Sequence, residues 1–164
     1  MENAEGARDE YRFLTRWQFD APVERVWAAI TDVERYPEWW PGVKSAVVIG
    51  PDRSLRVGQT AELAVRGSLP YTLHFRTEVV AFTPPARLAL RATGELTGRG
   101  EWNLTSTGNG TAATYLWEVR LVKAGFGLLA RLPGLRRVLA SNHDRVMAEG
   151  HANLVRLLAR GENQ

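Results

Sequence analysis

The sequence contains no cysteine. This absence excludes disulfide scaffolds, thiolate zinc sites, iron–sulfur clusters and cysteine nucleophiles. Histidine is also scarce, with three in the chain. His143 and His151 lie on one expected helix about 12 Å apart, which is too far to share an ion, and His74 falls on the polar face of an expected strand. The sequence therefore predicts neither a metal site nor a cofactor.

Long apolar runs are missing as well. No stretch reaches about 18 consecutive apolar residues, so no membrane span is expected, and the polar start over residues 1–12 is unlike a signal peptide. Lysine occurs only twice against 19 arginines, and the net charge is +3. Because the arginines alternate with glutamates, we expect no basic patch, no nucleic-acid partner and a cytoplasmic protein.

What is present fits one globular domain. The chain has 164 residues, 45% of them hydrophobic and 24% charged, which is typical of a soluble domain with its own core. We expect residues 1–10 to be a disordered lead and residues 11–161 to form the domain. Six tryptophans are many for this length, and such large side chains must be buried or must line a cavity.

Hydrophobic periodicity predicts the order strand, helix, helical turn, six strands, long helix. Residues 11–20 alternate as a half-buried strand does. A helix then starts at Pro22 and ends at Thr31, and Asp32 can cap one further turn. The last element is a helix over Leu135–Arg160. The remaining strands are expected at about 43–50, 58–66, 69–82, 86–94, 98–107 and 111–123.

Short turns between these strands indicate an antiparallel meander. A seven-stranded sheet with one polar face needs a cover on its apolar face, and the long C-terminal helix is the only element large enough. The predicted class is therefore α+β. A turn at 95–97 would pair Leu90 with Trp102, and a turn at Asn109-Gly110 would set Trp102 opposite Trp117. The register set by the turn at Asn109-Gly110 would also place two glutamates opposite each other, which is unfavourable. The alternation of residues therefore predicts which side chains face inward better than it predicts the cross-strand partners.

The inward face of the predicted sheet combines large aromatic residues with small ones. The small residues, from Ala92 to Gly100, form a column that includes Gly94 and Gly98. Two alternatives follow: another element packs closely on the glycines, or space remains beside them. The inward aromatic residues are Tyr71, Phe75, Trp102, Tyr115 and Trp117.

The long helix presents an unusual stripe toward the sheet. A helix that only sealed a core would carry leucine there, but Asn142, Gly150 and Asn153 interrupt the stripe. A buried asparagine is costly unless it is hydrogen-bonded. Asn142 is therefore either a polar anchor for a ligand or an asparagine bonded to a local backbone group or to Tyr115. The full stripe is Leu135, Leu139, Asn142, Val146, Gly150, Asn153 and Leu157.

Other side chains also allow two interpretations. His143 is either a general base at the edge of a cavity or a half-exposed helix residue. Tyr71 and Tyr115 are either proton donors to a ligand or core aromatics whose hydroxyls bond to backbone. Of the adjacent Trp39 and Trp40, one would pack under the first helix and the other would cap the cavity mouth, unless both only pack.

Two surface features complete the analysis. Residues 124–137 form an amphipathic basic segment, which would act as a lid or short helix, or alternatively touch a membrane surface without stable insertion. The edge strands of the sheet leave a homodimer possible.

Several motifs resemble a known family. They are Phe19–Trp27, Tyr36–Val43, Gly94–Leu104 and Asn142–Met147, and together they span about residues 11–160. The pattern is similar to the START-like (SRPBCC) superfamily, in particular to its polyketide cyclase/dehydrase branch of small bacterial proteins.

The resemblance implies a helix-grip fold, in which a curved antiparallel sheet wraps around a long C-terminal helix and leaves a deep apolar cavity. Members of the superfamily bind lipids, sterols, polyketides, plant hormones or other hydrophobic ligands, and some catalyse cyclisation or dehydration. They share no catalytic motif, so the resemblance assigns no catalytic residue here.

The expected function is therefore the binding of a small hydrophobic or aromatic ligand, polyketide-like or lipid-like, between sheet and helix. The alternative is a cyclase or dehydratase in which Tyr115, Asn142 and His143 steer an enolate. A third possibility is a collapsed cavity in a protein that contacts a partner. The expected ligand-binding residues are Trp40, Tyr71, Phe75, Trp102, Tyr115, Trp117, Asn142 and Val146.

Overall fold

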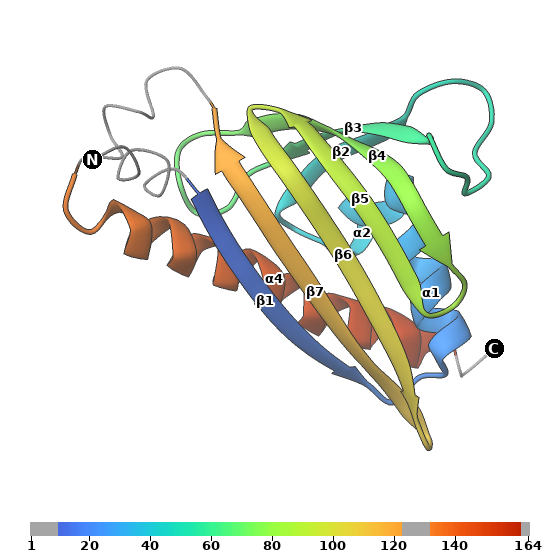
Figure 1. The fold of residues 1–164 in the computed structure, drawn as a ribbon. Coiled ribbons are helices and arrows are strands. Elements are labelled where there is room, and N and C mark those ends of the chain that lie inside the picture. Colours follow the sequence, from blue (N-terminus) through green and yellow to red (C-terminus); the bar gives the residue numbers. More distant parts are fainter. Residues whose placement is uncertain (1–9, 123–131, 162–164) are drawn as a thin grey trace, which may run out of the picture.

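A computed structural model describes residues 10–122 and 132–161. It contains one seven-stranded antiparallel sheet, and helix α4 lies along one face of this curved sheet (Figure 1). The elements, in chain order, are β1 (Glu10–Phe19), α1 (Val23–Thr31), the short 3₁₀ helix η1 (Val33–Arg35), α2 (Tyr36–Trp39), β2 (Val43–Val48), β3 (Thr60–Val65), β4 (Leu73–Thr83), β5 (Arg87–Gly94), β6 (Leu96–Thr107), β7 (Gly110–Leu121) and α4 (Leu135–Arg160).

The strand order is β1-β7-β6-β5-β4-β3-β2. Strands β2 to β7 form the expected meander, and β1 closes onto β7, so β1 and β2 are the two edges. The helices α1, η1 and α2 connect these edges (Figure 1). This is the helix-grip α+β fold that the sequence predicted. Whether an edge strand supports a homodimer stays a prediction.

Both predicted registers are wrong by two residues, although the inward and outward phase is right. Leu90 pairs with Gly100, and Trp102 pairs with Tyr115. The reason in the β6–β7 hairpin is the turn: its two central residues are Gly108 and Asn109 instead of Asn109 and Gly110, and Gly108, with φ +64°, takes the first position. A glycine at that position suits the type II′ hairpin turn.

The observed register also gives the outer face of the sheet a more favourable charge pairing than the predicted one. Arg99 lies opposite Glu118, where the predicted register would have placed a second glutamate. The Glu118 carboxylate accepts hydrogen bonds from Arg99 Nε at 2.5 Å and from Arg12 Nε at 2.9 Å. Both arginines are well exposed, so these pairs contribute little to stability. They do confirm that part of the arginine excess pairs with glutamate on the solvent side.

The glycine column is covered by its neighbours. A Cβ at Gly98 would lie 2.0 Å from the Glu118 carbonyl oxygen, and one at Gly100 would lie 2.9 Å from both the Trp117 ring and the Tyr115 hydroxyl. The first of the two alternatives therefore holds at these two positions: backbone packs directly on Gly98, and aromatic rings pack directly on Gly100.

The buried stripe of α4 differs from the predicted one in its second half. Val146 and Gly150 are buried as predicted, but the stripe continues through Leu154 and Leu158 rather than Asn153 and Leu157. The physical reason is the neighbour of this half: it packs on α1 and β1 instead of the sheet centre. Three contacts mark this packing, the Arg25 guanidinium to the Leu158 carbonyl, His151 to the Gln18 carbonyl, and the His151 ring on Trp17.

Two sequence predictions fall largely outside the described residues. Of the expected disordered lead, only residue 10 is described, and it starts β1. Residues 124–131 of the amphipathic segment are not described either. Within the described ranges, no helix is both long and apolar enough to cross a bilayer.

Candidate ligand-binding site

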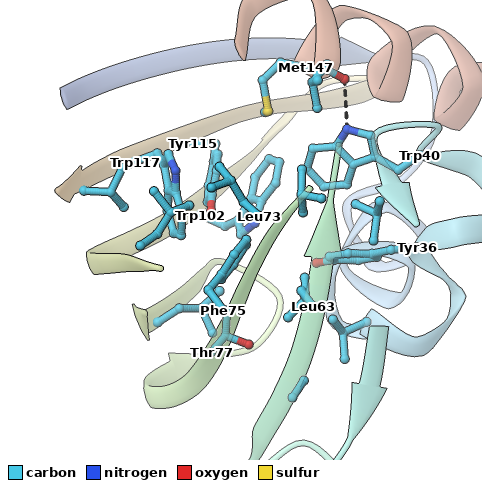
Figure 2. A pocket seen from close by; sticks show the side chains of 18 of the residues that line it. Tyr36, Trp40, Leu63, Leu73, Phe75, Thr77, Trp102, Tyr115, Trp117 and Met147 are labelled. Atoms are coloured by element: carbon cyan, nitrogen blue, oxygen red, sulfur yellow. Dashed lines mark hydrogen bonds between the residues drawn. The ribbon is translucent and has the colours of Figure 1, made fainter. Parts of the chain in front are cut away.

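A cavity of about 200 Å³ lies between the inner face of the sheet and α4. Figure 2 shows its wall, with side chains from α2, the sheet and α4 pointing toward one space. All eight residues predicted for the site line this cavity: Trp40, Tyr71, Phe75, Trp102, Tyr115, Trp117, Asn142 and Val146.

Three stacked rings form the sheet side of the cavity. The Tyr115 ring lies between those of Trp102, at 4.3 Å and 24°, and Trp117, at 5.8 Å and 21°. Phe75 of β4 packs obliquely on Trp117 at 5.9 Å. Because Trp102 and Trp117 are almost fully buried, these rings form a rigid aromatic wall. A planar apolar ligand has a matching surface there.

Trp40 holds the helix side in place. Its indole N–H donates to the Val146 carbonyl at 2.9 Å, as Figure 2 shows. Gly150, one turn further along α4, leaves room for the indole, since a Cβ there would lie 2.5 Å from Trp40 Nε1. Trp39 and Trp40 are both buried and stack on each other at 5.1 Å. Trp40 thus fixes the position of α4 through its contacts with Val146 and Gly150, and it also forms part of the cavity wall.

Asn142 is hydrogen-bonded to Ser68, a residue far away in the sequence, rather than to a local backbone group or to Tyr115. Its Oδ1 accepts a hydrogen bond from the Ser68 backbone N–H at 2.9 Å and another from the Ser68 hydroxyl at 3.1 Å. This contact ties α4 to the loop between β3 and β4. Gly67 makes the approach possible, because a Cβ there would lie 2.2 Å from Asn142 Oδ1. The asparagine in the stripe is explained by this anchor, although its side chain also lines the cavity.

His143 lines the same cavity and is more buried than a half-exposed helix residue, with a side-chain exposure of 16%. Its ring stacks on Phe13 at 3.9 Å and 12°. The Nδ1 atom is buried without a hydrogen-bond partner in the described part of the chain. The Asp144 carboxylate, 3.8 Å away, is too distant for a hydrogen bond. Burial lowers the pKa of His143, and the charge of Asp144 opposes this only in part.

Replacing His143 by phenylalanine is expected to stabilise the protein. The His143→Phe variant keeps an aromatic ring on Phe13 and removes a buried nitrogen without a partner, which costs about 1 kcal/mol or more. We expect the free energy of unfolding at pH 8, measured with urea, to rise by about 1 kcal/mol. A decrease of that size would show that the nitrogen has a structural role.

The same variant should change the pH dependence of stability. Since the pKa of His143 is lower in the folded state than its ordinary value of 6.5, the unfolded chain takes up its proton first as the pH falls. Stability should therefore decrease below about pH 6.5 in the parent protein. The decrease should be shallower in His143→Phe, and equal slopes would contradict the assignment.

The Tyr115 hydroxyl has no hydrogen-bond partner among the described residues. The alternative that this hydroxyl bonds to the backbone is therefore not found in that part of the chain. Burial raises the pKa of Tyr115 well above its ordinary value of 10.0, which keeps the hydroxyl protonated. Tyr71, nearer the surface, has a pKa that burial raises to a smaller extent. Tyr115 can therefore act as a hydrogen-bond donor inside the cavity.

The wall carries no formal charge in the described ranges: the residues that line it include no aspartate, glutamate, lysine or arginine. The same ranges contain no group of three or more potential metal-ligating side chains. What the arrangement offers is stacking, apolar contact and a few hydrogen bonds.

Sequence reasoning missed the end of the cavity near α1. Some residues there come from a segment without strand or helix periodicity, such as Leu55. Others come from predicted elements but were not assigned to the site, such as Gln59 and Ile30. Leu63 was already on the inward face of its predicted strand, and that signal could have found it. The residues of this end are Ile30, Thr31, Val33, Tyr36, Leu55, Gln59 and Leu63.

The fold and cavity place the chain in a defined class. A family model described as polyketide cyclase / dehydrase and lipid transport matches residues 19–147. The chain belongs to this family, which is the branch of the START-like superfamily that its motifs resembled. Among curated proteins, none matches the chain.

Solved structures share the fold at low identity. The Zhui aromatase/cyclase from Streptomyces sp. R1128 is 17% identical with a TM-score of 0.68, over 92% of this chain and 94% of that one. The protein TTHA0849 from Thermus thermophilus is 16% identical with a TM-score of 0.69, over 90% and 99%. The di-domain aromatase/cyclase BexL of the BE-7585A biosynthetic pathway is 21% identical with a TM-score of 0.63, over 92% of this chain and 51% of that one.

Proposed function

We propose that the protein binds a small hydrophobic or aromatic ligand in the cavity between the sheet and α4, using the eight wall residues predicted from the sequence. The observation that carries this proposal is the cavity itself, about 200 Å³ with an aromatic and uncharged wall. Sites for drug-sized ligands start at about 300 Å³, whereas an apolar cavity of about 150 Å³ accepts benzene. A ligand of one or two rings therefore fits this space.

The alternative is a cyclase or dehydratase that works in the same cavity. Family membership and the aromatase/cyclase neighbours support it. So does the presence of a protonated Tyr115 on β7 and a His143 with a lowered pKa on α4, both lining the same cavity, because an enolate needs a proton donor and a base. The small volume favours binding over the folding of a long polyketide chain.

Native mass spectrometry of the purified protein tests the proposed function. We expect a co-purifying neutral molecule of one or two rings, or, with an empty protein, thermal stabilisation by neutral bicyclic aromatics. A ligand at 100 times its Kd adds about 2.7 kcal/mol to the free energy of unfolding. No bound molecule and no stabilisation by any such compound would contradict the proposal. Turnover lost in Tyr115→Phe would instead favour the enzyme.

A further inference from the structure

We propose that the ligand is a neutral aromatic compound whose carbonyl oxygen accepts a hydrogen bond from the Tyr115 hydroxyl. This inference rests on the proposed function and names the ligand class that the cavity selects. Three features of the wall support this inference: its lack of formal charge, the internal partners of many of its other polar groups, and the fixed position of the Tyr115 ring.

The lack of charge selects a neutral ligand. Within the described ranges, no lysine or arginine lines the cavity, and burial lowers the pKa of His143, which favours its neutral form. A carboxylate or phosphate would lose its hydration in the cavity without gaining an ion pair, and burial of an unpaired charge is strongly unfavourable. A cationic ligand meets the same difficulty, because the described wall has no acidic side chain.

Many polar groups of the wall already have partners within the protein. A donor or acceptor that is satisfied internally contributes little to selecting a ligand. The groups in use are the Tyr36 hydroxyl on the Ile30 carbonyl, Trp40 Nε1 on the Val146 carbonyl, the Thr31 hydroxyl on the Trp27 carbonyl, Gln59 Nε2 on the Ser54 carbonyl, and Asn142 Oδ1 with Ser68.

The Tyr115 hydroxyl has no partner in the described part of the chain, which is also true of His143 Nδ1, but the hydroxyl is an O–H donor on a rigidly placed ring. The Tyr115 ring is held between Trp102 and Trp117, and its hydroxyl lies against Gly100, where a Cβ would come within 2.9 Å of the oxygen. A fixed donor costs little entropy when a ligand binds. Tyr115 lines the cavity together with other aromatic rings, so the preferred ligand combines an aromatic ring system with one oxygen acceptor.

Three bicyclic probes separate these elements in calorimetric titrations. They are 2-acetylnaphthalene, its isostere 2-isopropenylnaphthalene, which has CH₂ in place of the carbonyl oxygen, and anionic 2-naphthoate. We expect the ketone to bind about 2- to 10-fold more tightly than the isostere, as one neutral hydrogen bond allows. Naphthoate should bind at least about 10-fold more weakly than the ketone, because its charge would be buried without a partner.

Tyr115→Phe should reduce the ketone-to-isostere affinity ratio to about one while both compounds still bind. Thr105→Val is the matched control, because it removes a hydroxyl from an exposed position of β6 and should leave the ratio unchanged. Circular dichroism checks that both variants fold.

The outcomes distinguish the inference from the function on which it rests. Equal binding of ketone and isostere to the parent protein would overturn the inference and keep the proposed function. A ratio that survives in Tyr115→Phe would assign the donor to another wall group, such as Thr77, and overturn it too. Tight binding of naphthoate would overturn the neutral class. Failure of all three probes to bind would contradict the proposed function itself.

Discussion

Replacing Gly150 by leucine is expected to lower the free energy of unfolding by about 2 kcal/mol. Any Cβ at this position lies 2.5 Å from Trp40 Nε1, so the indole must move and its hydrogen bond to the Val146 carbonyl is lost. Overpacking of this kind costs about 1–3 kcal/mol, and the higher helix propensity of leucine recovers only about 0.8 kcal/mol. Urea denaturation measures the change.

Ala148→Leu is the control for this prediction. Ala148 is an exposed position of the same helix, and such a change is expected to stay within about 0.5 kcal/mol. In a Trp40→Leu background, Gly150→Leu should cost less by about 1 kcal/mol or more, because the two side chains share one space. Additive effects of the two substitutions would show that Trp40 and Gly150 do not act jointly in holding α4 in place.

The fold could be predicted because its signals are local and repeated. Alternation in the strands, the proline that starts α1 and the long helical pattern of α4 each identify an element, and short turns indicate a meander. The registers could not be read in the same way. A hairpin with Gly108, Asn109 and Gly110 has two possible turns, and the choice depends on cross-strand partners such as Arg99 and Glu118.

The site was predictable where its residues follow the inward and outward alternation of side chains along a strand. This alternation alone placed Trp102, Tyr115 and Trp117 on the inner face, and all three line the cavity. The alternation does not show which hydrogen bonds form. It could not show that Asn142 bonds to Ser68, nor that the described residues offer the Tyr115 hydroxyl no partner, because both depend on segments far away in the sequence.

Filling the cavity is expected to abolish ligand binding. Thr77 of β4 lies on the cavity wall beside Phe75 (Figure 2), and an indole in its place would occupy much of the roughly 200 Å³. We expect Thr77→Trp to weaken the binding of 2-acetylnaphthalene by about 100-fold or more, which corresponds to about 2.7 kcal/mol. Calorimetric titration measures the loss.

Thr105→Trp serves as the control, since it makes the same change at an exposed position of β6. It should keep the affinity of the parent protein. The large effect at Thr77 should come without a comparable loss of stability, because the new ring enters space that is already present and not a filled core. If Thr77→Trp folds and still binds the ketone within a few-fold of the parent, the ligand occupies another place on the protein. The cavity between the sheet and α4 would then have no part in its function.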